Sequence, residues 1–344
     1  ADNVVSRVDR AAAAESIGGE ALQLKGTRQE FRVEYDRSLS YPDGRRRMIG
    51  ARVFVTERAG RAFTLTGTEA EISAGDDRID FHGAVTLTSD DGFEAQAPEA
   101  AYTQSEGVMR ASGGAAFREG RVSGRSSRLT YDKNRDVLWM LDEAVLDMAS
   151  DSPQDSPVHI ESTNAGLARR DCYARFDGGF TLRHAARELG SEVATAYLSE
   201  DLSRVQVLEM RGRATVAGLG AGAGALRLMQ ADAITVEFAE DGRTLRGATL
   251  AEHASIDIGS ASGDPRRIAA RWIELRLADD GVTVTTLSAR DEVRLDLPAE
   301  GTQGAKTLRA AALAASGEGG GGLSAATLTG GVEYVETPPG ARAP

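Results

Sequence analysis

The chain has 344 residues, of which 41% are hydrophobic and only 5% aromatic, and its formal net charge is −12. The acidic residues are spread along the sequence and no large basic cluster is present, so we expect no nucleic acid among its partners. A single cysteine, Cys172, excludes an intramolecular disulfide. No stretch reaches the ~20 apolar residues of a membrane span. The composition therefore predicts a globular chain with a core of Val, Leu, Ile and Ala.

The first element predicted in chain order is a short helix within VVSRVDRAAAAESIGG (4–19), which has an Ala-rich middle. Residues 1–24 as a whole are interpreted as a leader into the first strands. Beyond residue 25 helical periodicity is nearly absent. Segments such as ITVEF (234–238) and IELRL (273–277) instead alternate apolar and polar residues with period 2, which predicts half-buried β-strands.

One unit recurs along most of the chain, about every 30 to 40 residues. It consists of a strand, an acidic or glycine-containing turn, a second strand and a further strand pair. Residues 83–102, GAVTLTSDDGFEAQAPEAAY, show its first half clearly. Further copies begin at residues 128, 193, 232 and 272, a degenerate copy covers 164–184, and a last one covers 312–336. Gly and Asp in the turns supply positive φ angles, as hairpins require.

A run of strands with short turns and no crossover helices predicts an all-β fold. Two sheets closed over their apolar faces would form an elongated β-jelly-roll or V-shaped sheet pair. The segment 148–160, rich in Ser, Pro and Asp, is the best internal boundary. It predicts two tandem modules, 25–150 and 156–336, followed by a frayed tail at 337–344. Residues 218–226 and 298–306 are predicted to be long hairpin loops.

The recurring units resemble the OstA-type repeats of the periplasmic lipopolysaccharide-transport proteins. The first half of the family pattern is filled by Gly83, Val85, Leu87, Asp91, Gly92, Phe93 and Ala97. Most of the second half is filled by Tyr131, Asp132, Val137, Trp139 and Val145, but Asp142 or Glu143 stands where Gly is usual. The module 25–150 resembles the LptC component of that family, and the module 156–336 is more similar to LptA.

The resemblance implies a periplasmic bridge or anchor component that shields lipopolysaccharide and passes it along an apolar β-groove during export to the outer membrane. It implies as partners lipopolysaccharide, an inner-membrane transporter complex, and other β-jelly-roll transport proteins joined by edge-strand addition. It also implies an inner-membrane anchor in an N-terminal segment outside this sequence. Because each buried CH₂ is worth ~0.8 kcal/mol, an apolar trough is sufficient for this task. We expect no enzyme activity, no cofactor and no metal.

The predicted groove lining consists of apolar residues from strands of both modules, with the inward face of each strand left open. These residues are Val85, Leu87, Phe93, Phe117, Leu129, Tyr131, Trp139, Ile234, Phe238, Ile256, Leu275 and Leu295. The alternative for each is that it fills a closed core. The basic run Arg45, Arg46 and Arg47 is interpreted either as a solvated hairpin tip or as a contact for lipid phosphates or an acidic partner edge.

Other functions are less well supported by the sequence. Gly220, Gly222 and Ala225 fit G-x-G-x-x-A, but a strand pattern follows where that dinucleotide motif requires a helix. The four histidines, His82, His159, His184 and His253, lack metal-site spacing. Acidic pairs such as Asp90–Asp91 suggest a glycosidase but lie in turns beside Gly. The main alternative is a structural or adhesive β-solenoid with a filled core, which a fully packed interior would favour.

Overall fold

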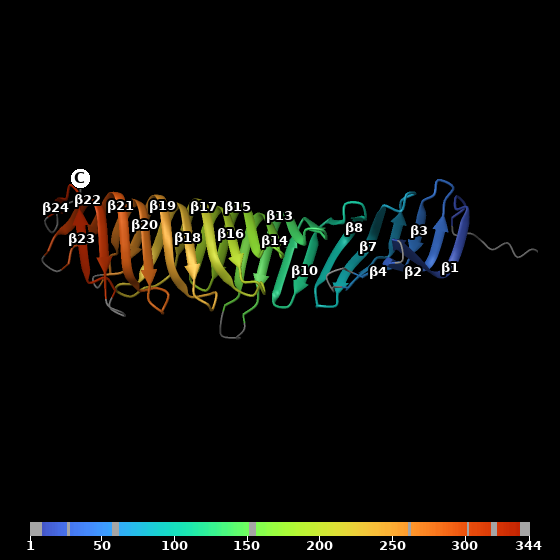
Figure 1. Cartoon of the computed structure of the whole chain (residues 1–344), viewed down its shortest axis with the longest axis horizontal. Helices are drawn as coiled ribbons and strands as arrows, with labels where there is room; N and C mark the ends of the chain where they lie inside the picture. The colour runs from blue at the N-terminus through green and yellow to red at the C-terminus, as the bar shows by residue number, and fades with distance from the viewer. Residues whose placement is uncertain are drawn as a thin grey trace, which may run out of the picture. The chain divides into compact units, whose positions relative to one another are not determined.

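The computed structural model describes residues 9–25, 28–56, 62–150, 156–260, 263–300, 303–317 and 322–337. These residues form 24 strands and no helix (Figure 1), so the predicted all-β fold is confirmed. They contain no helix that is long and apolar enough to cross a membrane. The chain divides into two compact units: unit 1 comprises Ala1–Asp151 with Asn164–Arg170, and unit 2 comprises Ser152–Thr163 with Asp171–Pro344. The predicted tail beyond residue 337 lies outside the described residues.

The predicted N-terminal helix is wrong for the part of the leader that the structure describes. After a turn at residues 10–11 the chain enters β1 (Ala14–Lys25), which pairs antiparallel with β2 (Arg28–Ser40). Helix propensity is a weak preference, worth about 0.7 kcal/mol or less per ordinary residue. A ladder of backbone hydrogen bonds to β2 outweighs it. Residues 1–8 lie outside the described residues.

Unit 1 consists of two walls of antiparallel strands. Wall A contains the short strands β3 (Arg46–Ile49), β6 (Glu69–Ile72), β9 (Val108–Ser112) and β12 (Arg128–Asp132). Wall B contains β4 (Arg52–Thr56), β5 (Ala62–Thr66), β10 (Ala115–Glu119) and β11 (Val122–Ser126). Longer strands contribute one half to each wall: β1, β2, β7 (Arg78–Ser89), β8 (Glu94–Thr103) and β13 (Val137–Met148). For example, the first half of β7 pairs with β6 and the second half with β5.

Two of the long strands, β7 and β13, change wall at corners where consecutive residues have positive φ angles. In β7 these are Gly83 and Ala84, with φ of 73° and 50°, and the ladder to β8 is interrupted at the same place. In β13 they are Asp142 and Glu143, both at 59°. The left-handed conformation costs about 1–2 kcal/mol for a residue with a Cβ. The chain thus makes the corner at Asp142 and Glu143 without a glycine.

Unit 2 is an antiparallel meander in which each strand from β15 to β22 pairs with the next one in the sequence (Figure 1). These strands are β15 (Tyr173–His184), β16 (Arg187–Leu198), β17 (Val205–Ala217), β18 (Leu226–Phe238), β19 (Leu245–Ile258), β20 (Arg266–Leu277), β21 (Val284–Leu297) and β22 (Ala305–Ser316). Both β23 (Ala325–Thr329) and β24 (Glu333–Thr337) pair with β22. The remaining strand, β14 (Val158–Ala168), has residues in the ranges of both units.

The ladders of unit 2 are interrupted near the middle of each strand, at corners like those of unit 1. Alternate strands place pairs of residues with positive φ there: Gly178–Gly179, Gly212–Arg213, Glu252–His253 and Asp291–Glu292. The two sets of strand halves form wall C and wall D. Wall C carries the cross-strand row Val216, Met229, Ile256, Ile268 and Leu295. Wall D carries the row Met210, Ile234, Leu250, Ile273, Ala289 and Leu313. Both rows are buried, so the core lies between the walls.

Candidate functional site

Unit 1 holds an apolar cavity of about 40 Å³ between its walls. Wall B contributes Val53, Val55, Phe63, Leu65 and Leu87, and wall A contributes Ile79, Phe81, Tyr102, Met109 and Tyr131. Gly107 and Lys133 complete the lining, and Lys133 is its only charged residue. A cavity must be polar as well as roomy to hold ordered water, and genuinely empty cavities are apolar. The lining therefore favours hydrocarbon over water.

Side chains close the mouth of unit 1, which is the side of the unit opposite the corners. The rings of Phe63 on wall B and Tyr131 on wall A lie 6.1 Å apart between centroids, inclined at 50°. Nearby, the hydroxyl of Tyr131 donates to the Asp136 carboxylate at 3.0 Å. Arg169, whose N–H bonds to the Asp136 carbonyl, forms a 2.5 Å ion pair with Glu119 at the end of β10. Two side-chain pairs thus connect the walls across the opening.

Unit 2 differs because its own side chains fill the space between its walls. The predicted lining residues Ile234, Ile256 and Leu275 are 0%, 0% and 1% exposed. Most of the largest fully buried side chains in the described part of the chain belong to this unit. Unit 2 therefore has the packing of a closed core.

Most of the predicted lining residues lie in the interior of their unit. Buried there are Val85, Leu87, Phe93, Phe117, Leu129, Ile234, Ile256, Leu275 and Leu295. Tyr131 and Phe238 are half-buried, and the alternation of β18 places Phe238 on the same face as Ile234 and Val236. Of the twelve, Leu87 and Tyr131 line the cavity. Whether any of them contacts lipid stays a prediction.

Trp139 is the exception, since it lies on the outer face of wall A. It pairs with Thr130, whereas its neighbours Leu138 and Met140 pair with Tyr131 and Leu129 on the inner face. Its ring lies against Gly166, where an added Cβ would be 2.5 Å from the ring. The prediction that Trp139 lines the groove is therefore corrected.

Several cavity residues were missed by the sequence analysis. Ile79 and Phe81 follow the period-2 alternation of β7, so their inward position could have been predicted. Phe63 alternates with Thr64 and Thr66 in β5, so its position could also have been predicted, whereas Met109 comes from the short strand β9, whose alternation is weak. Nothing in the sequence indicates that Lys133 reaches the lining.

The basic run at residues 45–47 is neutralised within unit 1. Arg45 contacts Asp43 at 2.7 Å and Glu71 at 3.1 Å, and Arg46 pairs with Asp76. Arg47 binds Glu69 through two nitrogens, one of them at 2.6 Å, and this contact holds the pKa of the Glu69 carboxyl below its usual value. A lipid phosphate would have to compete with these carboxylates, so the run is a poor candidate for the site.

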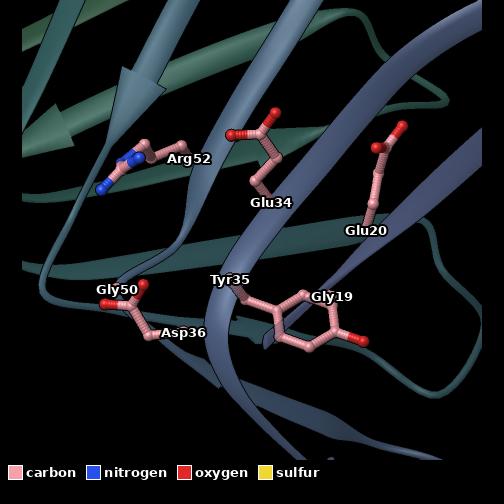
Figure 2. Close-up of a pocket in the computed structure, with 7 residues that line it drawn as sticks. All are labelled: Gly19, Glu20, Glu34, Tyr35, Asp36, Gly50 and Arg52. Atoms are coloured by element: carbon pink, nitrogen blue, oxygen red, sulfur yellow. The ribbon is translucent and has the colours of Figure 1, made fainter. Parts of the chain in front are cut away.

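A wider hollow of about 380 Å³ lies on the surface of β1, β2 and β4 (Figure 2). Its charged side chains are Glu20, Glu34, Asp36 and Arg52, beside the ring of Tyr35. In Figure 2 the carboxylates of Glu20, Glu34 and Asp36 lie apart from one another and do not converge. No group of three or more His, Cys, Asp or Glu residues in the described part of the chain could hold a metal ion. The apolar cavity is therefore the better candidate.

The glycine-rich segment does not have the context of a dinucleotide site. Ala225 is followed by β18, a strand, where the motif requires a helix. The carboxylate of Asp280, in another of the acidic turns, accepts hydrogen bonds from the N–H groups of Val282 and Thr283, as expected for a turn residue.

No protein-family model matches the chain, and a search of curated proteins finds no match. Since neither the glycine-rich segment nor this acidic turn forms a site, the functional proposal is based on the interiors of the two units.

Proposed function

We propose that this chain is a periplasmic lipid-shielding component that binds the acyl chains of lipopolysaccharide in unit 1 during export to the outer membrane. The observation that carries the proposal is the apolar cavity between walls A and B, with a mouth closed by side chains. Side chains can rotate aside without breaking the strand ladders. The similarity of the repeats to OstA-type proteins supports the same function.

The cavity as it stands is too small for an acyl chain, so the mouth has to open. A cavity of about 40 Å³ is well below the ~150 Å³ that accommodates a benzene ring. Separating the Phe63 and Tyr131 rings costs about 0.5–1.5 kcal/mol, and the partly exposed Arg169–Glu119 pair adds about 1 kcal/mol or less. Burying eight methylenes would contribute about 6 kcal/mol. The gain from burying the chain exceeds the cost of breaking these two contacts at the mouth.

Lys133 would set the orientation of a lipid bound in the cavity. It is the one charged residue in the lining, where it accompanies Tyr102 and Tyr131. A cation there attracts an anionic head group, and lipid phosphates are strong acceptors for it. The lipid would therefore enter with its acyl chain between the walls and its phosphate near Lys133.

Partner binding through strand edges is part of the same proposal. The strand β1 pairs with β2, and β24 pairs with β22. Ile17 on β1 and Val335 on β24 are 72% and 60% exposed. Exposed apolar edge strands favour strand addition to a second β-jelly-roll. The double variant Ile17→Lys with Val335→Lys should weaken self-association in analytical ultracentrifugation, and unchanged association would contradict the edge model.

Photo-crosslinking tests the lipid site directly. Tyr131 on the inner face and Trp139 on the outer face of wall A are replaced, one at a time, by benzoylphenylalanine in cells that make radiolabelled lipopolysaccharide. We expect lipid adducts at Tyr131 and none at Trp139, because only the first faces the cavity. A folded, expressed variant that gives no adduct at Tyr131, or equal adducts at both positions, would refute the proposal.

A second function, a structural scaffold, is favoured by one observation, the filled interior of unit 2. A core packed by its own side chains needs no ligand. In that case unit 2 would serve to extend or display unit 1. Adducts at an inward position of unit 2, such as Phe238, distinguish this scaffold from a second lipid-binding interior.

A further inference from the structure

The outer face of wall D carries two tyrosines that lie directly opposite each other. Tyr173 of β15 pairs with Tyr197 of β16, which in turn pairs with Val207 of β17. The neighbouring Ala196 and Leu208 are buried in the core, so the alternation of the strands places these three side chains on the solvent side. Tyr197 is 41% exposed, and the other two are half-buried. The three residues together are here named the tyrosine patch.

The hydroxyls of the tyrosine patch have no hydrogen-bond partner in the part of the chain that the structure describes. By contrast, the hydroxyls of Tyr41, Tyr131 and Tyr334 donate to carboxylates at 2.9, 3.0 and 2.7 Å. Trp272, an aromatic residue on the same outer face, also has a partner, because the Arg290 guanidinium lies 3.9 Å from its ring centroid. The tyrosine patch is therefore open to a ligand that other aromatic side chains of this chain could not accept.

A planar charged pair borders the tyrosine patch. Arg175, two residues beyond Tyr173 on the same face, binds the Asp177 carboxylate through Nε at 2.9 Å and Nη2 at 2.8 Å. This bond raises the pKa of the Arg175 guanidinium, and the phenols of Tyr173 and Tyr197 add a smaller contribution, so the rings lie beside it. Nη1 of Arg175 has no partner among the described residues. The pair therefore offers hydrogen-bond donors and acceptors in one plane.

The charges around the tyrosine patch cancel one another. Arg175 is matched by Asp177, and Arg211, on the next strand but one, contacts Glu209 at 3.4 Å. A phosphate or another strongly charged ligand would therefore find no excess of opposite charge at this place. The balance favours a ligand that is polar but uncharged.

The patch is also small for a protein partner. A stable protein interface buries about 800 Å² on each side, more than two partly exposed rings and a valine provide. Farther along the same cross-strand row, Glu237 and Arg276 form an ion pair across Gly247, so the apolar surface ends at Val207. The dimensions favour a ligand of a few rings.

We propose that the tyrosine patch is a binding site for a neutral saccharide. The C–H groups on one face of a pyranose ring pack on the negative face of an aromatic ring. Neighbouring sugar hydroxyls can accept from Arg175 and donate to Asp177, while the free phenol hydroxyls bond to others. The site shares no residue with the cavity of unit 1 and goes beyond the function proposed for it.

Fluorine NMR tests the site one residue at a time. The protein is labelled with 3-fluorotyrosine, and the signals of its seven tyrosines are assigned with single tyrosine-to-phenylalanine variants. The probes are neutral hexasaccharides of glucose, galactose and mannose. We expect the signals of Tyr173 and Tyr197 to shift together and to saturate with at least one probe. Tyr334, which is 54% exposed and bonded to Glu336, is the matched control and should not shift.

Three variants separate the ring, the hydroxyl and the charged pair. Tyr197→Thr, which keeps a strand-forming residue but removes the ring, should weaken binding read at Tyr173 by about tenfold or more. Tyr197→Phe keeps the ring and should weaken it by about threefold or less. Arg175→Lys keeps the charge but removes the planar fork, and should weaken it by about fivefold. Thermal unfolding checks that each variant is folded.

The contrary outcomes are equally specific. No shift at Tyr173 and Tyr197 with any of the three probes would overturn the proposal, as would equal shifts at Tyr334. Binding of polygalacturonate, an acidic saccharide, in place of the neutral probes would contradict the argument from charge. Equal losses in Tyr197→Thr and Tyr197→Phe would exclude stacking on the ring. Because no lipid is present, none of these results bears on the function proposed for unit 1.

Discussion

Units 1 and 2 have the same frame of bent antiparallel strands but close it in different ways. In unit 1, ring and ion-pair contacts span the mouth and an apolar cavity remains beneath them. In unit 2, main-chain bonds of residues 224–226 to residues 282–284 and to Gly259 span the mouth, and the interior is filled. The corners and ladders are alike in both. The difference shows that the frame does not decide whether the interior is hollow, since residues at the mouth and between the walls do.

The strands themselves also differ between the units. Many wall strands of unit 1 are short and belong to one wall, such as β5 and β6. Each strand from β15 to β22 continues through the corner and belongs to both walls. Moving a wall of unit 1 therefore disturbs shorter ladders. We expect unit 1 to be the more adaptable of the two.

The largest expected effect comes from truncating a matched leucine in each interior. Leu250→Ala in unit 2 should cost about 4 kcal/mol, because the fully packed core leaves a new cavity. Leu65→Ala in unit 1 should cost about 2 kcal/mol, because Leu65 already faces empty space and loses fewer contacts.

The two tryptophans allow each unit to be followed separately in urea. Trp139 lies in unit 1 and Trp272 in unit 2, so single-tryptophan variants report one unfolding transition each. Leu65→Ala is measured with Trp139 and Leu250→Ala with Trp272. Equal losses of unfolding free energy would remove the proposed contrast in packing.

The next effect concerns the corners. Gly178→Ala should destabilise unit 2 by about 2–3 kcal/mol, because the left-handed conformation alone costs about 1–2 kcal/mol and the new Cβ would lie 2.6 Å from the Thr163 hydroxyl oxygen. That hydroxyl donates to the Gly178 carbonyl at 2.7 Å. Gly179→Ala, where a Cβ meets open space, is the control and should cost only the conformational part. Thermal unfolding measures both, and equal costs would mean that the contact with Thr163 is unimportant.

Adding one methylene should have opposite signs in the two units. Val53→Ile extends into the cavity of unit 1 and should stabilise it by up to about 0.8 kcal/mol, while lowering lipid adducts at Tyr131. Val236→Ile in the packed interior of unit 2 should destabilise it by about 1 kcal/mol. The unfolding transitions of Trp139 and Trp272 measure the two values. The same sign in both units would contradict a hollow unit 1.

The smallest effect is electrostatic and belongs to the corner of β19. The exposed His253 ring lies 2.8 Å from the Asp232 carboxylate, and this hydrogen bond raises the pKa of His253 above its usual 6.5. Its contribution to stability is fully present below the unfolded pKa and disappears as the pH rises through the folded pKa. An NMR titration should show the raised value and its return toward 6.5 in Asp232→Asn. An unchanged pKa in that variant would exclude the ion pair.

Period-2 alternation and turn residues were sufficient to predict the all-β fold and most inward positions. In β18, Ile234 and Val236 alternate with polar neighbours, which fixes the face they share. Alternation fails in VLWML (137–141), where apolar residues are continuous and either face is compatible with the sequence. The face of Trp139 is set instead by the register of β13 with β12, a property of two strands together.

Contacts across the mouth could not be predicted, because they join residues far apart in sequence. The segment 218–226 was correctly interpreted as a connection between two strands, but its bonds to residues 282–284 depend on how walls C and D approach each other. The corners were missed for a local reason. Two residues with positive φ inside one continuous strand resemble a turn between two strands, and Glu252–His253 lacks even the glycine that would mark it.

Because β15 to β22 pair in sequence order, the topology of unit 2 does not limit how many strands it can contain. Because each strand contacts the one before it and the one after it, a duplicated hairpin inserted between two neighbours would find the same pair of edges to join. Such a gain or loss of two strands would leave the remaining ladders intact. The length of this unit could therefore change during evolution by one hairpin at a time, without changes to the residues of its interior.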